Sequence, residues 1–201
     1  LLINFKVILT NENKSYTKTN LIYYAKSEQD YLKYLNYYNR EIILKENNLK
    51  IDYSIKDKNI NLSNKLVIIG EIDLYLSSKI NVDSLNIENV SGNCKIENVK
   101  INKIVDLSTV SGDLTFYSIA CRDLNIKGVS SDISIINSAF DYLKIETVSG
   151  DINLENVDNA YKIFINTVSG DIESKIGLNI KHSKFSTVSG DIDISIKGDY
   201  N

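Results

Sequence analysis

The sequence has 201 residues, 43% of them hydrophobic, and a formal net charge of −3, which suits one elongated domain or a small cap joined to a repeat region. Residues 1–83 hold 12 Lys and Arg against 10 Asp and Glu, and residues 84–201 hold 11 against 16, so the acidic excess lies in the second part of the chain. Arg40 and Arg122 are the only arginines and no basic stripe is present, so nucleic acid is not an expected partner.

The N-terminal residues predict a β-strand. The run Leu2-Ile3-Asn4-Phe5-Lys6-Val7-Ile8-Leu9 is largely apolar, and the sequence neither begins with methionine nor contains one. We therefore expect a piece of a longer protein, with any membrane attachment made through a segment outside these residues.

Residues 10–60 do not repeat and predict a small α+β region. Ser27 followed by Asp30 resembles a helix capping box and predicts a helix over 28–38. The residues on one face of this helix are Tyr31, Leu32, Leu35 and Tyr38. Segments 41–45 and 49–55 predict a β-hairpin across Glu46-Asn47-Asn48. Because a solenoid needs its first coil covered, we interpret residues 1–65 as an N-terminal cap.

Tyrosines are concentrated in the same region. Most of them are expected to line the core of the cap. Tyr34 and Tyr37, on the other side of the predicted helix, are candidates for contact with carbohydrate, since exposed aromatic rings stack on sugars.

From Val90 onward the tetrad Val-Ser-Gly-Asp, or a near copy, returns six times at steps of 20, 19, 19, 20 and 20 residues. A fixed period of this size indicates a solenoid, whose repeats bury their apolar faces by stacking on their neighbours. The copies begin at Val90, Val110, Val129, Val148, Val168 and Val188.

Apolar residues alternate with polar ones on both sides of each tetrad, which is the pattern of a half-buried strand. Four residues after the valine, for example, the chain has Cys94, Leu114, Ile133, Ile152, Ile172 and Ile192. The dominance of Ile, Val and Leu at period two argues against helices. Independent hairpins are harder to exclude, but the near-constant repeat length favours coils that stack about 4.8 Å apart.

We therefore predict an all-β fold: a single-stranded β-helix, or β-solenoid, of 19–20 residues per coil over residues 66–201, with the α+β cap before it. Gly70 to Leu76 parallels Gly190 to Ile196, which predicts an additional coil starting near Leu66. At the other end only five residues follow Ile196, too few for another coil. The end is covered by this tail, by a second molecule or by residues beyond Asn201; Lys197 and Asp199 discourage edge pairing and favour a monomer over an end-to-end dimer.

The corner residues of the repeat have distinct expected roles. The valine is expected to point inward at the bend, and the glycine to supply positive φ or a close backbone approach. In the third copy Ser131 replaces the glycine, and Gly128 lies three residues earlier. The residues that define the regular corners are Val110, Gly112, Val148, Gly150, Val168, Gly170, Val188 and Gly190.

A column of acids follows the corner glycines and is the sharpest candidate site. Its members are Asp113, Asp132, Asp151, Asp171 and Asp191, with Asn93 and Glu71 extending it. Stacked carboxylates repel one another, so something must offset them. Ca²⁺, which takes six to eight oxygen ligands, is one possibility, although the nonapeptide pattern of calcium-binding β-rolls is absent. The other, which we favour, is that each carboxylate accepts backbone N–H bonds and faces water.

Three further residues have side chains that are common in active sites. His182 is the single histidine, has no nucleophile at a matching spacing, and is expected on the surface of a return loop. Cys94 occupies an inward ladder position, whereas Cys121 lies at a non-equivalent place in the next coil, so we expect two free thiols. No catalytic and no cofactor-binding residue is predicted.

Thr-Val-Ser-Gly-Asp-Ile, at 147–152, 167–172 and 187–192, resembles the signature of a bacterial adhesin-like family of unknown function with β-strand repeats, related to the head domains of auto-transporter adhesins. The resemblance covers residues 66–201 strongly and the cap weakly. It implies a right-handed β-helix on an extracytoplasmic, often membrane-anchored protein of the cell envelope, and it transfers no catalytic residue. Ser131 and Asn93 depart from the motif.

Together these features predict a non-enzymatic binding or scaffolding module that contacts an envelope protein or a glycan. The alternative is a polysaccharide lyase or hydrolase, since parallel β-helices host such enzymes. A hydrolase needs two carboxylates in contrasting environments, and a uniform acid ladder does not supply that contrast.

Overall fold

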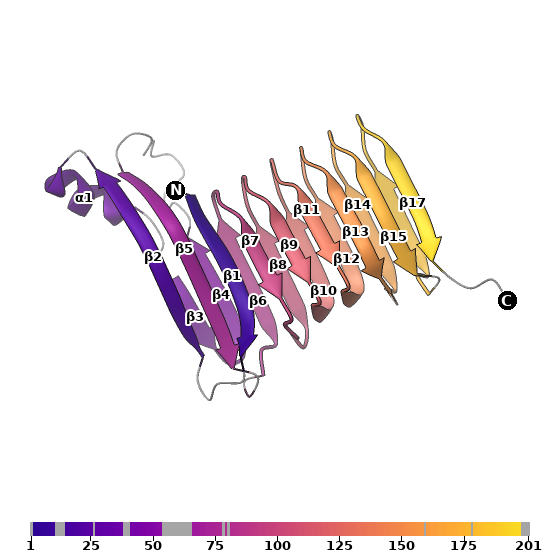
Figure 1. Ribbon diagram of the computed structural model, residues 1–201, viewed down its shortest axis with the longest axis horizontal. Helices are drawn as coiled ribbons and strands as arrows, with labels where there is room; N and C mark the ends of the chain where they lie inside the picture. The colour runs from indigo at the N-terminus through magenta and orange to yellow at the C-terminus, as the bar shows by residue number, and fades with distance from the viewer. Residues whose placement is uncertain are drawn as a thin grey trace.

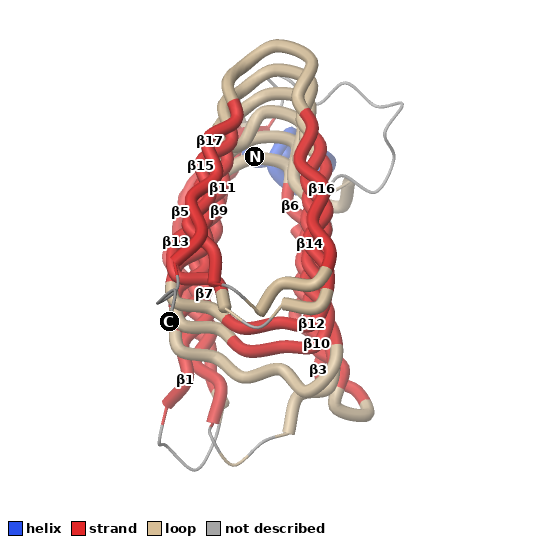
Figure 2. Tube along the Cα trace, turned by 90° about the vertical axis from the view of Figure 1, so that its right-hand side faces the viewer, coloured by secondary structure: helices blue, strands red, loops and turns tan. Residues whose placement is uncertain are grey.

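The chain folds into an elongated β-solenoid, seen from the side in Figure 1 and along its length in Figure 2. The computed structural model describes residues 2–10, 15–25, 27–37, 41–53, 66–77, 79, 81–158, 160–177 and 179–197. The N-terminal strands and the single described helix lie at one end of the rod, and the coils then follow in chain order to the C-terminal end (Figure 1). The predicted all-β solenoid fold is confirmed.

Two sheets face each other across the rod (Figure 2). The strands of the nine-stranded sheet are, in spatial order, β17 (Ile192–Lys197), β15 (Ile172–Gly177), β13 (Ile152–Val157), β11 (Ile133–Ile136), β9 (Leu114–Tyr117), β7 (Cys94–Glu97), β1 (Leu2–Thr10), β5 (Leu66–Ser77) and β2 (Tyr16–Ala25). Those of the eight-stranded sheet are β16 (His182–Ser186), β14 (Lys162–Asn166), β12 (Ala139–Glu146), β10 (Ala120–Lys127), β8 (Ile104–Ser108), β6 (Ser84–Asn89), β4 (Asn48–Tyr53) and β3 (Glu41–Lys45). From β6 onward each coil contributes one strand to each sheet, and neighbouring coils pair in parallel.

The core consists of inward side chains stacked coil upon coil. Ile152 is 1% exposed and pairs with Ile133 on one side and Ile172 on the other, as the alternation of the sequence predicts. Ile192, Ile194 and Ile196 occupy the same columns in β17 but are partly exposed, because β15 is the one described strand beside β17.

The N-terminal strand β1 is inserted into the solenoid. Val7 on β1 is fully buried between Leu74 of β5 and Ile96 of β7, and all three strands run parallel. The additional strand predicted near Leu66 therefore exists as β5, but it is one position further from the first repeat than the sequence similarity suggests. The apolar alternation of β1 fits either place, so the repeat pattern alone could not predict the insertion.

The helix and the hairpin lie close to where the sequence predicts them, but the helix ends at Leu35 instead of residue 38 and the hairpin loop has two residues instead of three. Helix α1 covers Glu28–Leu35, and its N-terminus is capped by the Ser27 hydroxyl, which accepts the Asp30 N–H at 3.1 Å. Glu46 and Asn47 form the two-residue loop between β3 and β4. Their φ angles of 49° and 64° lie in the left-handed region, which this type of hairpin turn requires at both positions.

The predicted face of the helix was partly wrong. Tyr31 and Leu35, which are one helical turn apart, pack against the core. Leu32 lies on the outer side of the helix and is exposed. Tyr37, a candidate for carbohydrate contact, is partly buried and also packs against the core. Tyr38, the end of the predicted hairpin at Ile55 and the side chain of Tyr34 lie outside the described residues.

Candidate functional site

In four of the six repeats, the side chain before the corner valine points into the solenoid and closes the turn. Thr167 is fully buried, and its hydroxyl donates to the carbonyl oxygen of Ser169 at 3.2 Å. Thr109 and Thr147 make the same bond to Ser111 and Ser149. In the first repeat Asn89 replaces the threonine, and its amide donates to the Gly92 carbonyl oxygen. This inward side chain therefore gives a turn carbonyl a side-chain donor, and the carbonyls of Ser149 and Ser169 also accept a backbone N–H from the coil before.

The expectation that the valines point inward is wrong. Val110, Val148 and Val168 are 51%, 50% and 46% exposed, and Val188 is more exposed still. The physical reason is the two-residue alternation: once the threonine is inward, the next side chain must point outward at the tip of the corner. The valines form an exposed ridge along one edge of the rod.

The corner glycines combine both of the features expected of them. Gly112, Gly150, Gly170 and Gly190 have φ of 112°, 123°, 139° and 145°. In addition, a methyl group at Gly150 would overlap the carbonyl oxygen of Ser131 in the coil below, so the corners stack too closely for any side chain. Ser131 itself has no positive φ and is buried, yet its N–H donates to Ser149 as the N–H of Gly150 donates to Ser169.

The acid column connects successive coils. The carboxylate Oδ1 of Asp132 accepts the N–H of Asp151, that of Asp151 accepts the N–H of Asp171, and that of Asp171 accepts the N–H of Asp191, all at 2.8–2.9 Å. Asn93 does the same for the N–H of Asp113 at 2.8 Å. All five aspartates face solvent. Each bond offsets part of the repulsion between stacked carboxylates, because the N–H dipole points at the negative charge.

Within the described residues, the acid column lacks the arrangement of ligands that a metal ion needs. Across the described ranges of the chain, no group of three or more His, Cys, Asp or Glu side chains is arranged to hold a metal ion. The stacked acids also share a single line rather than surrounding a point, whereas Ca²⁺ needs oxygens on several sides.

A second ladder of turns was not predicted. It lies at the C-terminal ends of β7, β9, β11 and β13. Its residues adopt positive φ of 52–53° and are Asn98, Ser118, Asn137 and Asn156. The amide of Asn156 donates to Asn137 Oδ1 at 2.8 Å. Asparagine tolerates the left-handed region, so the recurrence of Asn or Ser at 19–20 residues was a readable signal.

The two thiols are free, as expected. Burial raises the pKa of Cys94 to about 12. Burial, with the nearby charges of Asp123 and Asp141, also raises the pKa of Cys121 to about 12. Cys121 lies beside a groove of about 430 Å³, where Arg122 is held by the Asp123 carboxylate at 2.8 Å. A thiol that stays protonated at neutral pH is a poor nucleophile, so this groove has no activated cysteine.

The outer face of the eight-stranded sheet carries an aromatic column near its C-terminal end. The rings of Tyr142 and Tyr161 lie 5.6 Å apart at 58°, and those of Tyr161 and His182 lie 5.5 Å apart at 70°. His182 is exposed, as predicted, but it begins strand β16 instead of lying in a loop. The sequence did not predict this column, because its members lie outside the fixed positions of the repeat.

Lysines surround this column. Across β12, β14 and β16 the register aligns Tyr142, Lys162 and His182 in one outward row, and Lys144, Phe164 and Lys184 in the next. Lys181 Nζ lies 5.5 Å from the centre of the Tyr161 ring, and Lys184 Nζ lies 5.6 Å from that of Phe164. A groove of about 330 Å³ opens between the rows, lined by Tyr142, Lys144, Lys162 and Phe164 together with Asn125 and Glu146.

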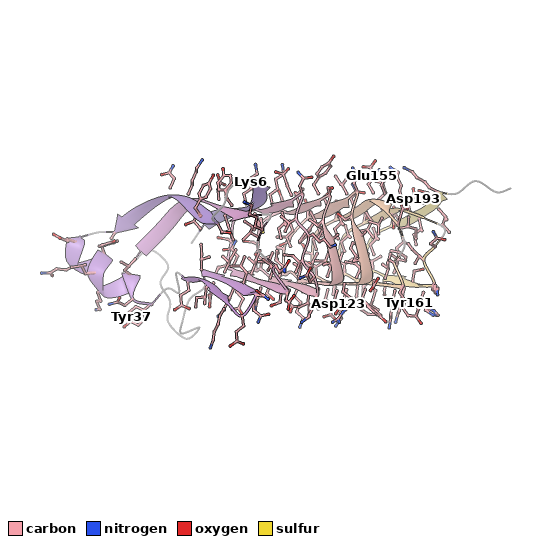
Figure 3. The ribbon with its side chains drawn as sticks, turned by 90° about the horizontal axis from the view of Figure 1, so that it is seen from below. Lys6, Tyr37, Asp123, Glu155, Tyr161 and Asp193 are labelled. Atoms are coloured by element: carbon pink, nitrogen blue, oxygen red, sulfur yellow. The ribbon has the colours of Figure 1, made fainter. Side chains whose placement is uncertain are left out.

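Toward the C-terminal end of the rod, the strands of the two outer faces differ in their acidic residues. Strands β14 and β16 contain no Asp or Glu, whereas the opposite strands β13, β15 and β17 carry Glu155, Glu173 and Asp193 beside Lys175 and Lys197. Figure 3 shows Glu155 and Asp193 pointing away from the rod on one side and Tyr161 on the other. The aromatic and cationic side chains therefore form one patch, the Tyr161 face, defined by Tyr142, Lys144, Tyr161, Lys162, Phe164, Lys181, His182 and Lys184.

Comparison with known proteins places the chain in a family. The family model described as Toastrack DUF4097 matches residues 23–201, which include every copy of the repeat. No curated protein and no solved structure matches the chain. Within the described residues, no helix has the length and apolar character needed to cross a membrane.

Proposed function

We propose that this chain, which belongs to the Toastrack DUF4097 family, is a non-enzymatic binding and scaffolding module of the bacterial cell envelope. It acts outside the cytoplasm, as an adhesin-like rod that holds a binding face at a fixed distance from its point of attachment. The motif Thr-Val-Ser-Gly-Asp-Ile and its resemblance to envelope proteins support the location. The rod acts as a monomer.

The observation that carries the proposal is that the polar side chains of the corners form hydrogen bonds within the rod. The repeated carboxylates of Asp132, Asp151 and Asp171 accept hydrogen bonds from the next coil, and the threonine hydroxyls close the turns. A catalytic pair of carboxylates needs two different environments, one that raises a pKa and one that keeps a charge. The ladder gives its members one environment, which suits mechanical support.

The test is a retention assay with two readouts. The purified protein is immobilised and exposed to solubilised cell-envelope material, and retained glycans and proteins are measured beside any shortening of the glycan chains. We expect retention of envelope material without cleavage, and a protein that retains nothing contradicts the proposal.

Asp151→Asn serves as the control for catalysis. The asparagine keeps the oxygen that accepts the Asp171 N–H, as Asn93 does for Asp113, so the fold is expected to survive the change. Cleavage by the original protein that disappears in this variant, at an unchanged melting temperature, would identify a polysaccharide lyase or hydrolase and overturn the proposal.

A further inference from the structure

We infer that the Tyr161 face is a binding site for an acidic polysaccharide, a polymer of pyranose rings that carry carboxylates. This inference rests on the proposed function, since it names the ligand class of the binding module. Three features of the face lead to it: an exposed aromatic column, lysines without carboxylate partners, and a groove with hydrogen-bonding groups.

The aromatic column offers a surface for sugar rings. Tyr142 and Tyr161 are each a little over 40% exposed, although burying a tyrosine ring is favourable. The C–H faces of a pyranose ring pack on such an apolar surface while its hydroxyls stay hydrated. Each coil adds one residue to each outward row. The face is therefore elongated along the rod and suits a polymer more than a small molecule.

The lysines supply charge complementarity. Among the residues that the structure describes, no ion pair includes Lys162, Lys181 or Lys184, whereas Lys144 is paired with Glu146 at 3.0 Å. Three uncompensated cations lie on one face of a repeat region whose net charge is negative. A row of ring carboxylates would neutralise them, and the cations over the rings of Tyr161 and Phe164 would hold the sugar against the aromatic surface.

The groove selects sugar over nucleic acid. Asn125 and Glu146 line it, and an amide and a carboxylate both form hydrogen bonds with sugar hydroxyls. The rings of the column are tilted by 58° and 70°, so they offer no parallel stack for successive bases.

The experiment measures affinity by isothermal titration for four polymers that separate ring from charge. Polygalacturonate has both, dextran has rings without charge, poly-glutamate has carboxylates without rings, and oligo-dT represents single-stranded nucleic acid. We expect binding of polygalacturonate alone, weakening as salt is added. Equal affinity for poly-glutamate would reduce the face to a nonspecific cation patch, and tighter binding of oligo-dT would assign it to nucleic acid; either outcome overturns the inference.

Three variants locate the site. Tyr161→Ala and the double variant Lys162→Gln/Lys184→Gln are each expected to weaken polygalacturonate binding about tenfold or more. Lys175→Gln, which removes one positive charge from the opposite sheet, is expected to change the affinity less than about twofold. Melting temperatures verify that the variants are folded. If Tyr161→Ala does not fold, the double lysine variant still tests the site.

Failure of the inference is distinguishable from failure of the proposed function. Equal losses in Lys175→Gln and in the face variants, or no binding of polygalacturonate by a protein that still retains envelope material, would overturn the inference alone. A protein that binds none of the polymers and retains no envelope material contradicts both.

Discussion

At the scale of single residues, the corners depend on backbone geometry that one residue type can supply. Gly150 has φ of 123° and approaches the backbone of Ser131 too closely for a side chain, whereas Gly128 has no positive φ and lies near the side chains of Thr147 and Ser131. These two glycines, both next to the third corner, therefore differ in what a methyl group would cost.

Gly150→Ala is expected to lower the free energy of unfolding by about 3 kcal/mol or more, the combined effect of left-handed strain of about 1–3 kcal/mol and overpacking of about 1–3 kcal/mol. Gly128→Ala is expected to cost less than about 1 kcal/mol. Urea unfolding of both variants measures the difference. Similar costs at both positions would show that the corner conformation does not limit stability.

Core columns and outer positions alternate along the same strand, so neighbouring residues give a matched pair. Ile152→Ala is expected to cost about 2–5 kcal/mol through lost burial and a cavity between Ile133 and Ile172. Asn153→Ala, which changes an outward side chain, is expected to cost about 0.5 kcal/mol or less. The same unfolding assay decides, and equal effects would mean that the strand phase is wrong.

At the scale of the element, each coil satisfies its buried polar groups locally, with informative exceptions. The Thr167 hydroxyl is buried and donates to Ser169, whereas the Ser174 hydroxyl, in an inward column of β15, is buried without a partner. The coils before and after have Leu154 and Ile194 in that column. Ser174 thus interrupts an apolar stack without gaining a hydrogen bond.

Two variants that remove a hydroxyl should therefore act in opposite directions. Ser174→Ala is expected to leave stability unchanged or raise it by about 1 kcal/mol, because an unpaired buried polar atom is removed. Thr167→Val is expected to lower stability by about 1 kcal/mol, because the Ser169 carbonyl loses one of its two donors and keeps the N–H of Gly150. Thermal unfolding of the two variants compares them. A loss at Ser174 as large as that at Thr167 would reveal a hydrogen bond of the Ser174 hydroxyl that this account lacks.

The sequence predicted these elements well where the repeat is regular. The inward columns through Ile133, Ile152 and Ile172 follow from alternation alone, because a one-residue slip would turn every side chain to the other face. The direction of the corner valines did not follow, since apolar character favours burial while the threonine hydroxyl, through a specific hydrogen bond, takes the inward place. The aromatic column of Tyr142, Tyr161 and His182 could not be read from fixed positions, because aromatic residues do not recur at one position of every repeat.

At the scale of the whole molecule, the rod is a stack of parallel coils with β1 inserted near one end. Its stability is then a sum of coils and of the contacts between neighbouring coils. The acid column contributes to those contacts through backbone N–H groups. The rod therefore carries an acidic edge at its corners, and its lysine-rich face lies on the eight-stranded sheet.

Removal of divalent cations should not affect this architecture. Because Asp132, Asp151 and Asp171 are offset by N–H donors, we expect EDTA to change the melting temperature by less than about 1 °C, and added Ca²⁺ to do the same. Differential scanning calorimetry in both buffers checks this. A fall in melting temperature with EDTA that Ca²⁺ reverses would show that the column binds calcium after all.

The measurement that tests the central claim most directly is the mapping of polygalacturonate binding by backbone amide chemical shifts in the labelled protein. The account predicts that shifts concentrate at residues 142–146, 161–166 and 181–186, on and beside β12, β14 and β16, with the corner residues 188–193 and the opposite strands β13 and β15 unchanged. Shifts centred on the acidic corners or on the opposite sheet, or shifts spread evenly over the rod, would contradict it.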